Sequence, residues 1–190
     1  RLGVLLLVAL AAEATLAHEP FVPGTYGDAM RWYRKAAGWG DAGAQFFLGY
    51  KYETGEGVRR DLSLAREWYW KAAVQGHLAA QFRLAFLYYR GEGGEADIDE
   101  AVRWYLEAAE RGHVPAQSML GYLYTGVDAL PENIPEAFFW LSLAARAGDE
   151  DAAANAELVA KALSDEALSA AHERLRVWRP QPAPTQAPDG

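Results

Sequence analysis

The stretch Ala65-Arg66-Glu67-Trp68-Tyr69-Trp70-Lys71-Ala72-Ala73-Val74-Gln75-Gly76-His77 recurs along the chain at a fixed spacing. Its first tryptophan has three counterparts in one frame, which gives a 36-residue series: Trp32, Trp68, Trp104 and Trp140. Each of these tryptophans is followed by an Ala pair at the fourth and fifth positions, a Gly at the eighth and an Ala at the twelfth. A fixed period of about 20–50 residues is typical of repeat proteins. The sequence therefore predicts a repeat architecture.

Each repeat has the pattern of two helices joined by a short turn. Residues suited to cap a first helix recur at the 36-residue spacing: Thr25, Asp61, Asp97 and Asn133. After Asp61, the apolar side chains follow the 3.6-residue period of one helix face, and Gly76 ends this helix. A second helix is expected to begin after each of a second series of caps: Asp41, His77, His113 and Asp149.

One hairpin has too much apolar surface to bury alone, and stacking successive hairpins covers it. The sequence therefore predicts an all-α solenoid of four helix–turn–helix repeats, at residues 25–60, 61–96, 97–132 and 133–163. Residues 164–179 are expected to form one further helix that caps the stack, and the Pro-rich residues 180–190 are expected to be disordered. We expect the four repeated tryptophans to lie in the core. Gly49 and Gly121 stand where the second repeat has Ala85, which predicts a close approach of neighbouring helices.

The first 17 residues differ from the rest of the chain. Arg1 is followed by an apolar run from Leu2 to Ala12 and then by small residues. This is the layout of a secretory signal peptide, with cleavage expected after Ala17 or, as an alternative, after Ala14. The other interpretation is an N-terminal membrane anchor, although the run is shorter than the roughly 20 residues that span a bilayer. Residues 18–24 form a short lead-in, and no second membrane segment is expected.

Composition excludes several classes of function. The 190-residue chain has a net charge of -8, which argues against nucleic acid as a partner because phosphate binding needs clustered Lys and Arg. It contains no cysteine, which excludes disulfides, thiolate metal sites and a cysteine nucleophile.

The second repeat resembles a known family in the run Trp68-Tyr69-Trp70-Lys71-Ala72-Ala73-Val74-Gln75-Gly76-His77-Leu78-Ala79-Ala80-Gln81 and in the following Leu84-Ala85-x-x-Tyr88-x-x-Gly91. These residues are similar to the Sel-1-like repeat, a relative of the tetratricopeptide repeat, and the resemblance covers roughly residues 25–163. It implies an α/α solenoid and a role in protein–protein interaction, and it implies no shared active site. Some secreted members that are rich in cysteine have been linked to β-lactam hydrolysis, an activity that we do not transfer to a chain without cysteine.

Residues with catalytic or metal-binding potential do not form a recognisable motif. His77 and His113 share one repeat position that Asp41 and Asp149 occupy elsewhere, which favours a cap over a metal ligand. The serines lack the G-x-S-x-G and S-x-x-K patterns of nucleophiles. A pair of carboxylates facing each other across a cleft, as in a glycosidase, is not readable from sequence. We therefore expect no enzyme activity, metal or cofactor.

The outward-facing positions of the first helices remain as the candidate binding surface. In tetratricopeptide-like stacks the first helices line the concave face, and by resemblance we place these positions there. Trp70 and Leu106 are the apolar exceptions on a polar surface, at the same offset in adjacent repeats, although packing of Trp70 against a neighbouring helix is the alternative. We expect Phe139 and Leu143 to be covered by the C-terminal helix. The predicted partner-binding residues are Arg31, Arg34, Glu67, Trp70, Lys71, Val74, Arg103 and Leu106.

The sequence thus predicts a non-enzymatic interaction module of the bacterial cell envelope, periplasmic or secreted, that binds a protein or peptide on its concave face. A glycan-binding protein with Trp70 as a stacking platform is one alternative, and an envelope hydrolase is another. The oligomeric state stays open.

Overall fold

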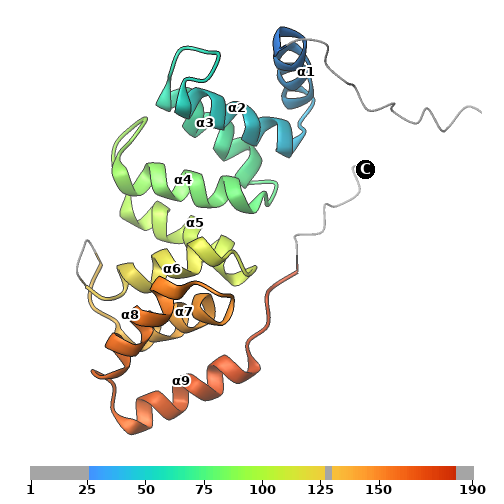
Figure 1. Cartoon of the computed structure of the whole chain (residues 1–190). Coiled ribbons are helices and arrows are strands. Elements are labelled where there is room, and N and C mark those ends of the chain that lie inside the picture. Colours follow the sequence, from blue (N-terminus) through green and yellow to red (C-terminus); the bar gives the residue numbers. More distant parts are fainter. Residues whose placement is uncertain (1–25, 127–129, 183–190) are drawn as a thin grey trace, which may run out of the picture. The chain divides into compact units, whose positions relative to one another are not determined.

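A computed structural model describes residues 26–126 and 130–182. Over these ranges the chain forms nine α-helices and no strand, which confirms the predicted all-α solenoid (Figure 1). The helices are α1 (Tyr26–Gly38), α2 (Ala42–Thr54), α3 (Leu62–Ala73), α4 (Leu78–Arg90), α5 (Ile98–Glu110), α6 (Val114–Leu123), α7 (Ile134–Arg146), α8 (Glu150–Ala160) and α9 (Asp165–Val177). The chain divides into two units after Trp32, within α1, and the packing described below is that of the unit from Tyr33 onward.

Side-chain caps start the first helices, as the sequence predicts. Asp61, Asp97 and Asn133 each accept a hydrogen bond of 3.0–3.3 Å from the backbone amide three residues later. These bonds satisfy one of the free N–H groups at the start of each helix. Thr25 lies outside the described residues.

The second helices follow the same rule with one exception. Asp41, His77 and Asp149 accept bonds of 2.6–3.2 Å from the amide three residues later. His113 was predicted to do the same, but its side chain makes no capping bond. Pro115 in this first turn has no N–H to donate, and the Ala116 amide donates to the His113 carbonyl instead, at 3.0 Å.

Successive hairpins pack through neighbouring second and first helices. Helix α2 packs against α3, α4 against α5, and α6 against α7. A Cβ added to Gly49 would lie 2.6 Å from the Tyr69 ring, and one added to Gly121 would lie 2.4 Å from Leu141. The close approach predicted at these two glycines is therefore confirmed, since only a residue without a side chain fits there.

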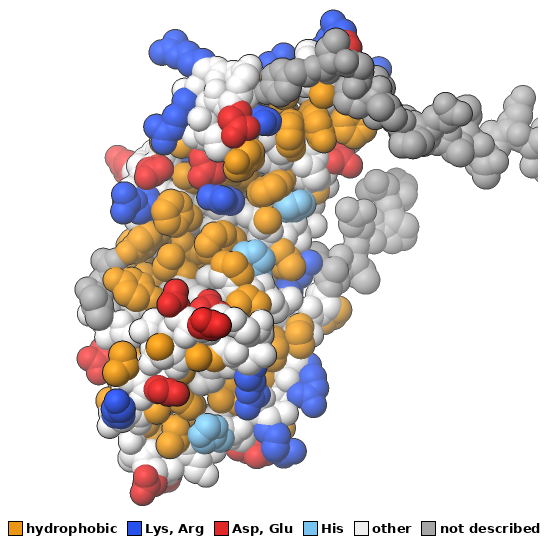
Figure 2. Space-filling model, viewed as in Figure 1, with side chains coloured by type: hydrophobic (Ala, Val, Ile, Leu, Met, Phe, Trp, Pro, Cys, Tyr) orange, Lys and Arg blue, Asp and Glu red, His pale blue; other side chains and the backbone are white. Residues whose placement is uncertain are grey.

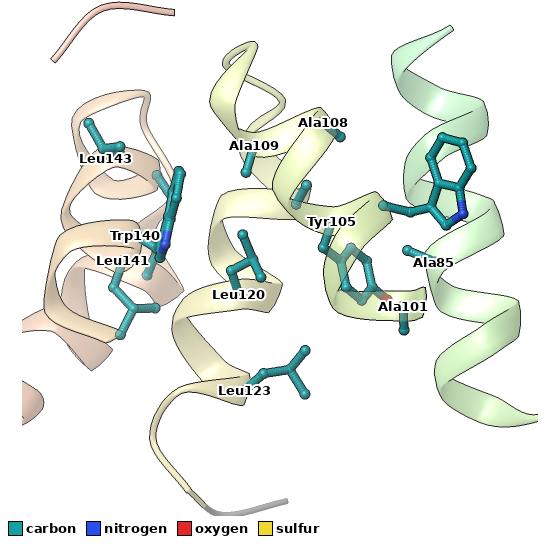
Figure 3. Close-up of a cluster of buried hydrophobic side chains, with 14 of the residues drawn as sticks. Ala85, Ala101, Tyr105, Ala108, Ala109, Leu120, Leu123, Trp140, Leu141 and Leu143 are labelled. Atoms are coloured by element: carbon teal, nitrogen blue, oxygen red, sulfur yellow. The ribbon is translucent and has the colours of Figure 1, made fainter. Parts of the chain in front are cut away.

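The core runs continuously between these helices. Figure 3 shows part of it, with Tyr105 on α5 pointing toward α4 and Trp140 lying between α7 and α6. Trp104 and Trp140 are buried as predicted, at 4% and 3% exposure. Trp32 and Trp68 are only half-buried, so the prediction of a core position is wrong for them. The Lys71 ammonium group lies over the Trp68 ring, 4.2 Å from the ring centroid.

Three buried glutamines at 36-residue spacing tie the two helices of each hairpin together. The side-chain amides of Gln45, Gln81 and Gln117 donate to backbone carbonyls at the ends of α1, α3 and α5, over 3.0–3.2 Å. Each of these carbonyls also accepts a bond from the backbone amide of the glycine three residues later, so the glutamine adds a second bond that joins the two helices. The fourth repeat has Ala153 at this position and lacks the bond.

Helix α9 packs against α7. Leu175 is 3% exposed, and its backbone carbonyl accepts a 2.7 Å hydrogen bond from Arg146. The Arg174 guanidinium lies 3.6 Å from the Phe139 ring centroid and pairs with Glu136. Phe139 is consequently buried at 1% exposure and Leu143 at 5%, as expected for residues that the C-terminal helix covers.

The chain then reaches the end of α5. The Gln181 amide donates to the Glu110 carbonyl at 2.8 Å, and its side chain donates to the Glu110 carboxylate at 2.7 Å. The prediction of disorder from residue 180 onward therefore does not fit residues 180–182. Residues 183–190, like the predicted signal peptide 1–17 and lead-in 18–24, lie outside the described residues.

Candidate functional site

Helix α3 exposes two large apolar side chains. Its buried face consists of Ala65, Tyr69, Ala72 and Ala73, so positions on the opposite side of the helix point outward. Trp70 is 49% exposed, and Val74, the C-cap residue, is 52% exposed. Exposed apolar groups that lie together on a surface indicate a recognition site more strongly than isolated ones.

A shallow hollow of about 410 Å³ lies beside Trp70 and is called the Trp70 hollow below. The Arg66 guanidinium lies 3.7 Å from the Tyr88 ring centroid and donates to the Glu95 carbonyl at 3.2 Å. One face of Tyr88 is thus covered by a cation. The hollow is lined by Ser63, Arg66, Glu67, Trp70, Lys71, Tyr88 and Gly93.

A second hollow, also about 410 Å³, lies between the C-terminal ends of α3 and α5 and is called the Gln81 hollow. The end of the described chain forms part of its rim. Two arginines and one glutamate give it a charged border around a floor that includes buried Trp104. The hollow is lined by Ala73, Val74, Gly76, Gln81, Arg103, Trp104, Glu107, Arg111, Gln181 and Pro182.

A third and more polar hollow of about 640 Å³ lies between the end of α1 and the start of α3. Arg34 and Leu64 border it together with Tyr52 and the turn at residues 57–61. All three hollows therefore adjoin first helices, and α3 contributes to each of them.

The structure distributes the predicted partner-binding residues over these hollows. Glu67, Trp70 and Lys71 line the Trp70 hollow, and Val74 and Arg103 line the Gln81 hollow. Arg34 lines the polar hollow.

Two of the predicted residues lie elsewhere. Leu106 is half-buried and packs against the core, so it does not form the exposed pair with Trp70 that the sequence predicts. Arg31 is exposed and pairs with Asp28 within the N-terminal unit.

The second helices carry apolar surface as well. Figure 2 shows hydrophobic side chains gathered over α4. Phe82, Phe86 and Tyr89 on this helix are half-buried and pack against the core. These rings pack one side against the core, whereas Trp70 and Val74 are about half exposed. The α3 surface is therefore the stronger candidate for a binding site.

The titration shifts in the chain have structural causes. Burial, together with a hydrogen bond to Glu53, raises the pKa of the Tyr69 hydroxyl. Burial lowers the pKa of His77 and of His113. Hydrogen bonds from Ser118 and from the Ala152 amide lower the pKa of Asp149.

No group of three or more His, Asp or Glu side chains able to hold a metal ion occurs in residues 26–126 and 130–182. In the same ranges, no helix is long and apolar enough to cross a membrane.

Sequence reasoning missed several residues of the Trp70 hollow and of the Gln81 hollow. Tyr88, Gln81 and Arg111 line them but stand on or beside other elements, and Gln181 is distant in sequence. The 36-residue spacing of Gln45, Gln81 and Gln117 was a usable signal, since buried polar residues rarely recur in frame without a bonding role. Nothing in the sequence indicated that Gln181 reaches α5.

This architecture is that of a helical-repeat protein whose first helix α3 exposes apolar side chains. The chain belongs to the Sel1 repeat family, whose repeat matches residues 26–38, 42–77, 78–113 and 114–149. The last three matched units have the predicted 36-residue period but start at the second helix of a hairpin, and the match at 26–38 covers α1 alone. Sel1 repeat proteins are generally protein-interaction scaffolds.

The solved structures that are similar to this chain include the following two. A Sel1 repeat protein from Oxalobacter formigenes is 38% identical, with a TM-score of 0.65, over 70% of this chain and 55% of that one. The protein c5321, a protective antigen present in uropathogenic Escherichia coli strains and displaying an SLR (Sel1-like repeat) fold, is 25% identical with a TM-score of 0.59, over 86% of this chain and 44% of that one. This chain thus spans about half the length of either neighbour. No curated protein matches it.

Proposed function

We propose that this chain is a non-enzymatic interaction module of the bacterial cell envelope. It binds a protein or peptide on the exposed side of α3 and α5, opposite the faces that these helices bury in the core. In a tetratricopeptide-like stack this surface is the concave one. The observation that carries the proposal is the exposure of Trp70 and Val74 between two hollows bordered by charged side chains. Aromatic anchors beside arginines are the residues that contribute most to protein interfaces.

The location in the envelope rests on the predicted signal peptide. After its removal the chain would begin at His18 or, with the alternative site, at Thr15. Fractionation of the source bacterium and N-terminal sequencing of the purified chain test this part. A chain that keeps its apolar N-terminus and stays in the cytosol would contradict it.

The binding surface is tested by photo-crosslinking. A photoreactive phenylalanine analogue is introduced at Trp70 or at Val74, and the full chain is irradiated in an extract of the envelope fraction. The matched control carries the analogue at Leu158, which is 61% exposed on α8. We expect one partner to crosslink from positions 70 and 74 and not from 158.

The outcomes separate the alternatives. Crosslinking from position 158 alone would place the interface on another surface. If the chain binds polysaccharide from the extract and crosslinks to no protein, the result would favour the glycan-binding alternative, in which Trp70 acts as a stacking platform. The Tyr88 ring offers less to a sugar, because the Arg66 guanidinium already covers one of its faces.

A further inference from the structure

The chain turns back along the stack of repeats after α9. Helix α9 packs against α7 of the fourth repeat. Pro180 then lies beside the end of α5 in the third repeat, where a Cβ added to Gly112 would be 3.6 Å from the proline ring. Gln181 fixes the segment there, because its backbone and side-chain amides both donate to Glu110, at 2.8 and 2.7 Å. The segment therefore runs from the fourth repeat to the third (Figure 1).

The next residue leads to the second repeat. Pro182, the last described residue, lines the Gln81 hollow together with Ala73, Val74 and Gly76 at the C-terminal end of α3. Val74 is one of the two exposed apolar residues that carry the proposed binding surface. The described chain thus passes the fourth, third and second repeats in turn and stops at the surface proposed for a partner.

The residues that follow are numerous enough to cross the exposed side of α3. Residues 183–190 read Ala-Pro-Thr-Gln-Ala-Pro-Asp-Gly, and eight residues in an extended, proline-rich conformation span roughly 25 Å. Along α3, the distance from Val74 back to Arg66 is about 12 Å, at a rise of about 1.5 Å per residue. Trp70 stands one turn before Val74. Both Trp70 and the Trp70 hollow are therefore within reach of this segment.

The chemistry of the segment matches the surface in two respects. Proline-rich segments bind exposed aromatic rings well, because their backbone is already restricted and loses little entropy on binding. Trp70, at 49% exposure, offers such a ring. The one charged side chain among residues 183–190 is Asp189. The Trp70 hollow presents two cations, Arg66 and Lys71, against a single carboxylate, Glu67.

We propose that residues 183–190 bind the exposed side of α3 across Val74 and Trp70, and that a partner must displace them from it. The contacts of Gln181 with Glu110 hold the segment in place for this. The inference rests on the proposed function, since it assigns an intramolecular competitor to the same surface. A weak contact suffices, because a short tether keeps the effective concentration of the segment in the millimolar range.

The contact is tested in the purified full chain, without any partner. The photoreactive phenylalanine analogue, itself aromatic, is placed at Trp70, and crosslinks are located by proteolysis and mass spectrometry. An equal mixture of isotope-labelled and unlabelled chains separates crosslinks within one chain from those between two copies. We expect crosslinks within one chain from position 70 to residues 183–190, and none from the control position Leu158 on α8. Absence of this crosslink, or its formation only between copies, would overturn the inference.

Two variants test what holds the segment. Gln181→Pro removes both donors to Glu110 and keeps the length of the chain. Asp189→Lys places a cation beside Arg66 and Lys71. Each is expected to lower the yield of the crosslink from position 70 by at least about threefold, with an unchanged melting temperature that shows the fold to be intact. Unchanged yields in both variants would contradict the proposed path of the segment.

A chain that ends after Pro182 tests the competition. With the analogue at position 70 in the envelope extract, this shortened chain should crosslink at least about threefold more partner than the full chain, because nothing occupies the surface. Equal capture by the two chains would overturn the competition. If neither chain captures a protein, the proposed function fails, and the crosslink within the purified chain still decides whether residues 183–190 bind α3.

Discussion

Helices α3 and α7 are the first helices of their repeats, but their outward-facing apolar residues stand at different positions. Where α3 has the charged residues Glu67 and Lys71, α7 has Phe139 and Leu143, which α9 covers. Where α7 has Ser142 and Arg146, α3 has Trp70 and Val74, which are about half exposed.

The comparison shows that the equivalent helix of two repeats can carry its apolar side chains for two purposes. The apolar residues of α7 close the stack against the chain's own C-terminal helix. The apolar residues of α3 stand at different offsets, so they are not the remains of such an internal contact. They are placed where a second molecule can reach them, which is the basis of the proposed binding surface.

The largest effect is expected when the cover of α7 is weakened. Leu175→Ala removes most of a buried side chain from α9 and should lower the free energy of unfolding by about 2–5 kcal/mol. Urea denaturation followed by circular dichroism measures this loss. Val177→Ala on the same helix is the control, because Val177 is 57% exposed and its truncation should change stability by less than about 0.5 kcal/mol. Similar values for the two variants would show that α9 does not cover α7.

Arg174→Ala tests the polar part of the same contact. Arg174 stacks on Phe139 and pairs with Glu136, but its side chain is 46% exposed, so solvent screens the ion pair. We expect a loss of about 1 kcal/mol, most of it from the stacking. Arg176→Ala, whose ion pair with Glu173 is more exposed, should leave the melting temperature unchanged. An equal effect of both variants would contradict the role of Phe139 as the stacking partner.

A smaller, pH-dependent effect should distinguish the two helices. Helix α4, beside α3, is capped by His77, whereas α8, beside α7, is capped by Asp149. Burial lowers the pKa of His77 in the folded chain, so the unfolded chain binds the proton first as the pH falls. The stability that neutral His77 contributes is complete above about pH 6.5 and is lost as the pH falls through the pKa of His77 in the folded chain. The lowered pKa of Asp149 keeps its cap intact throughout this window.

Thermal melts between pH 7 and pH 5 measure this difference. His77→Asp places the cap of α8 on α4 and should reduce the fall in melting temperature across this range. His172→Gln, a substitution at an exposed position of α9, should leave the fall as it is in the parent. An identical fall in the parent and in His77→Asp would show that protonation of His77 does not affect stability.

The smallest effect on stability is expected on α3. Trp70→Ala/Val74→Ala removes two half-exposed side chains from a helix whose opposite face forms the core, so unfolding should change by less than about 0.5 kcal/mol. Thermal and urea denaturation measure the change. A loss as large as that of Leu175→Ala would mean that the two side chains support the fold and are not a free surface.

Much of the fold could be predicted from the sequence because the repeat is exact in spacing. The 36-residue period fixed the order of the helices, and the series of Asp and Asn caps located most of their starts. The need for the C-terminal helix to dock predicted that Phe139 and Leu143 are covered, and the repeat positions of Gly49 and Gly121 predicted that they lie against neighbouring helices.

The remaining differences have their causes in tertiary contacts that periodicity does not encode. Trp68 and Trp104 are equivalent in the repeat, but only Trp104 is buried, and Leu106 packs inward where its counterpart Trp70 points out. Gln181 contacts Glu110 across 71 positions of sequence, a distance that local patterns cannot bridge. The candidate site could thus be predicted as a surface, whereas its hollows required the arrangement of α3, α4, α5 and the chain end.

The most direct test of the central claim compares two variants for binding of the crosslinked partner. Isothermal titration calorimetry gives its Kd for the parent, for Trp70→Ala/Val74→Ala and for Leu158→Ala/Val177→Ala, which truncates side chains of similar exposure on α8 and α9. If the exposed side of α3 is the binding surface, the first variant should bind at least about tenfold more weakly and the second within about twofold of the parent. Equal affinity of both variants, or a loss confined to the second, would contradict it.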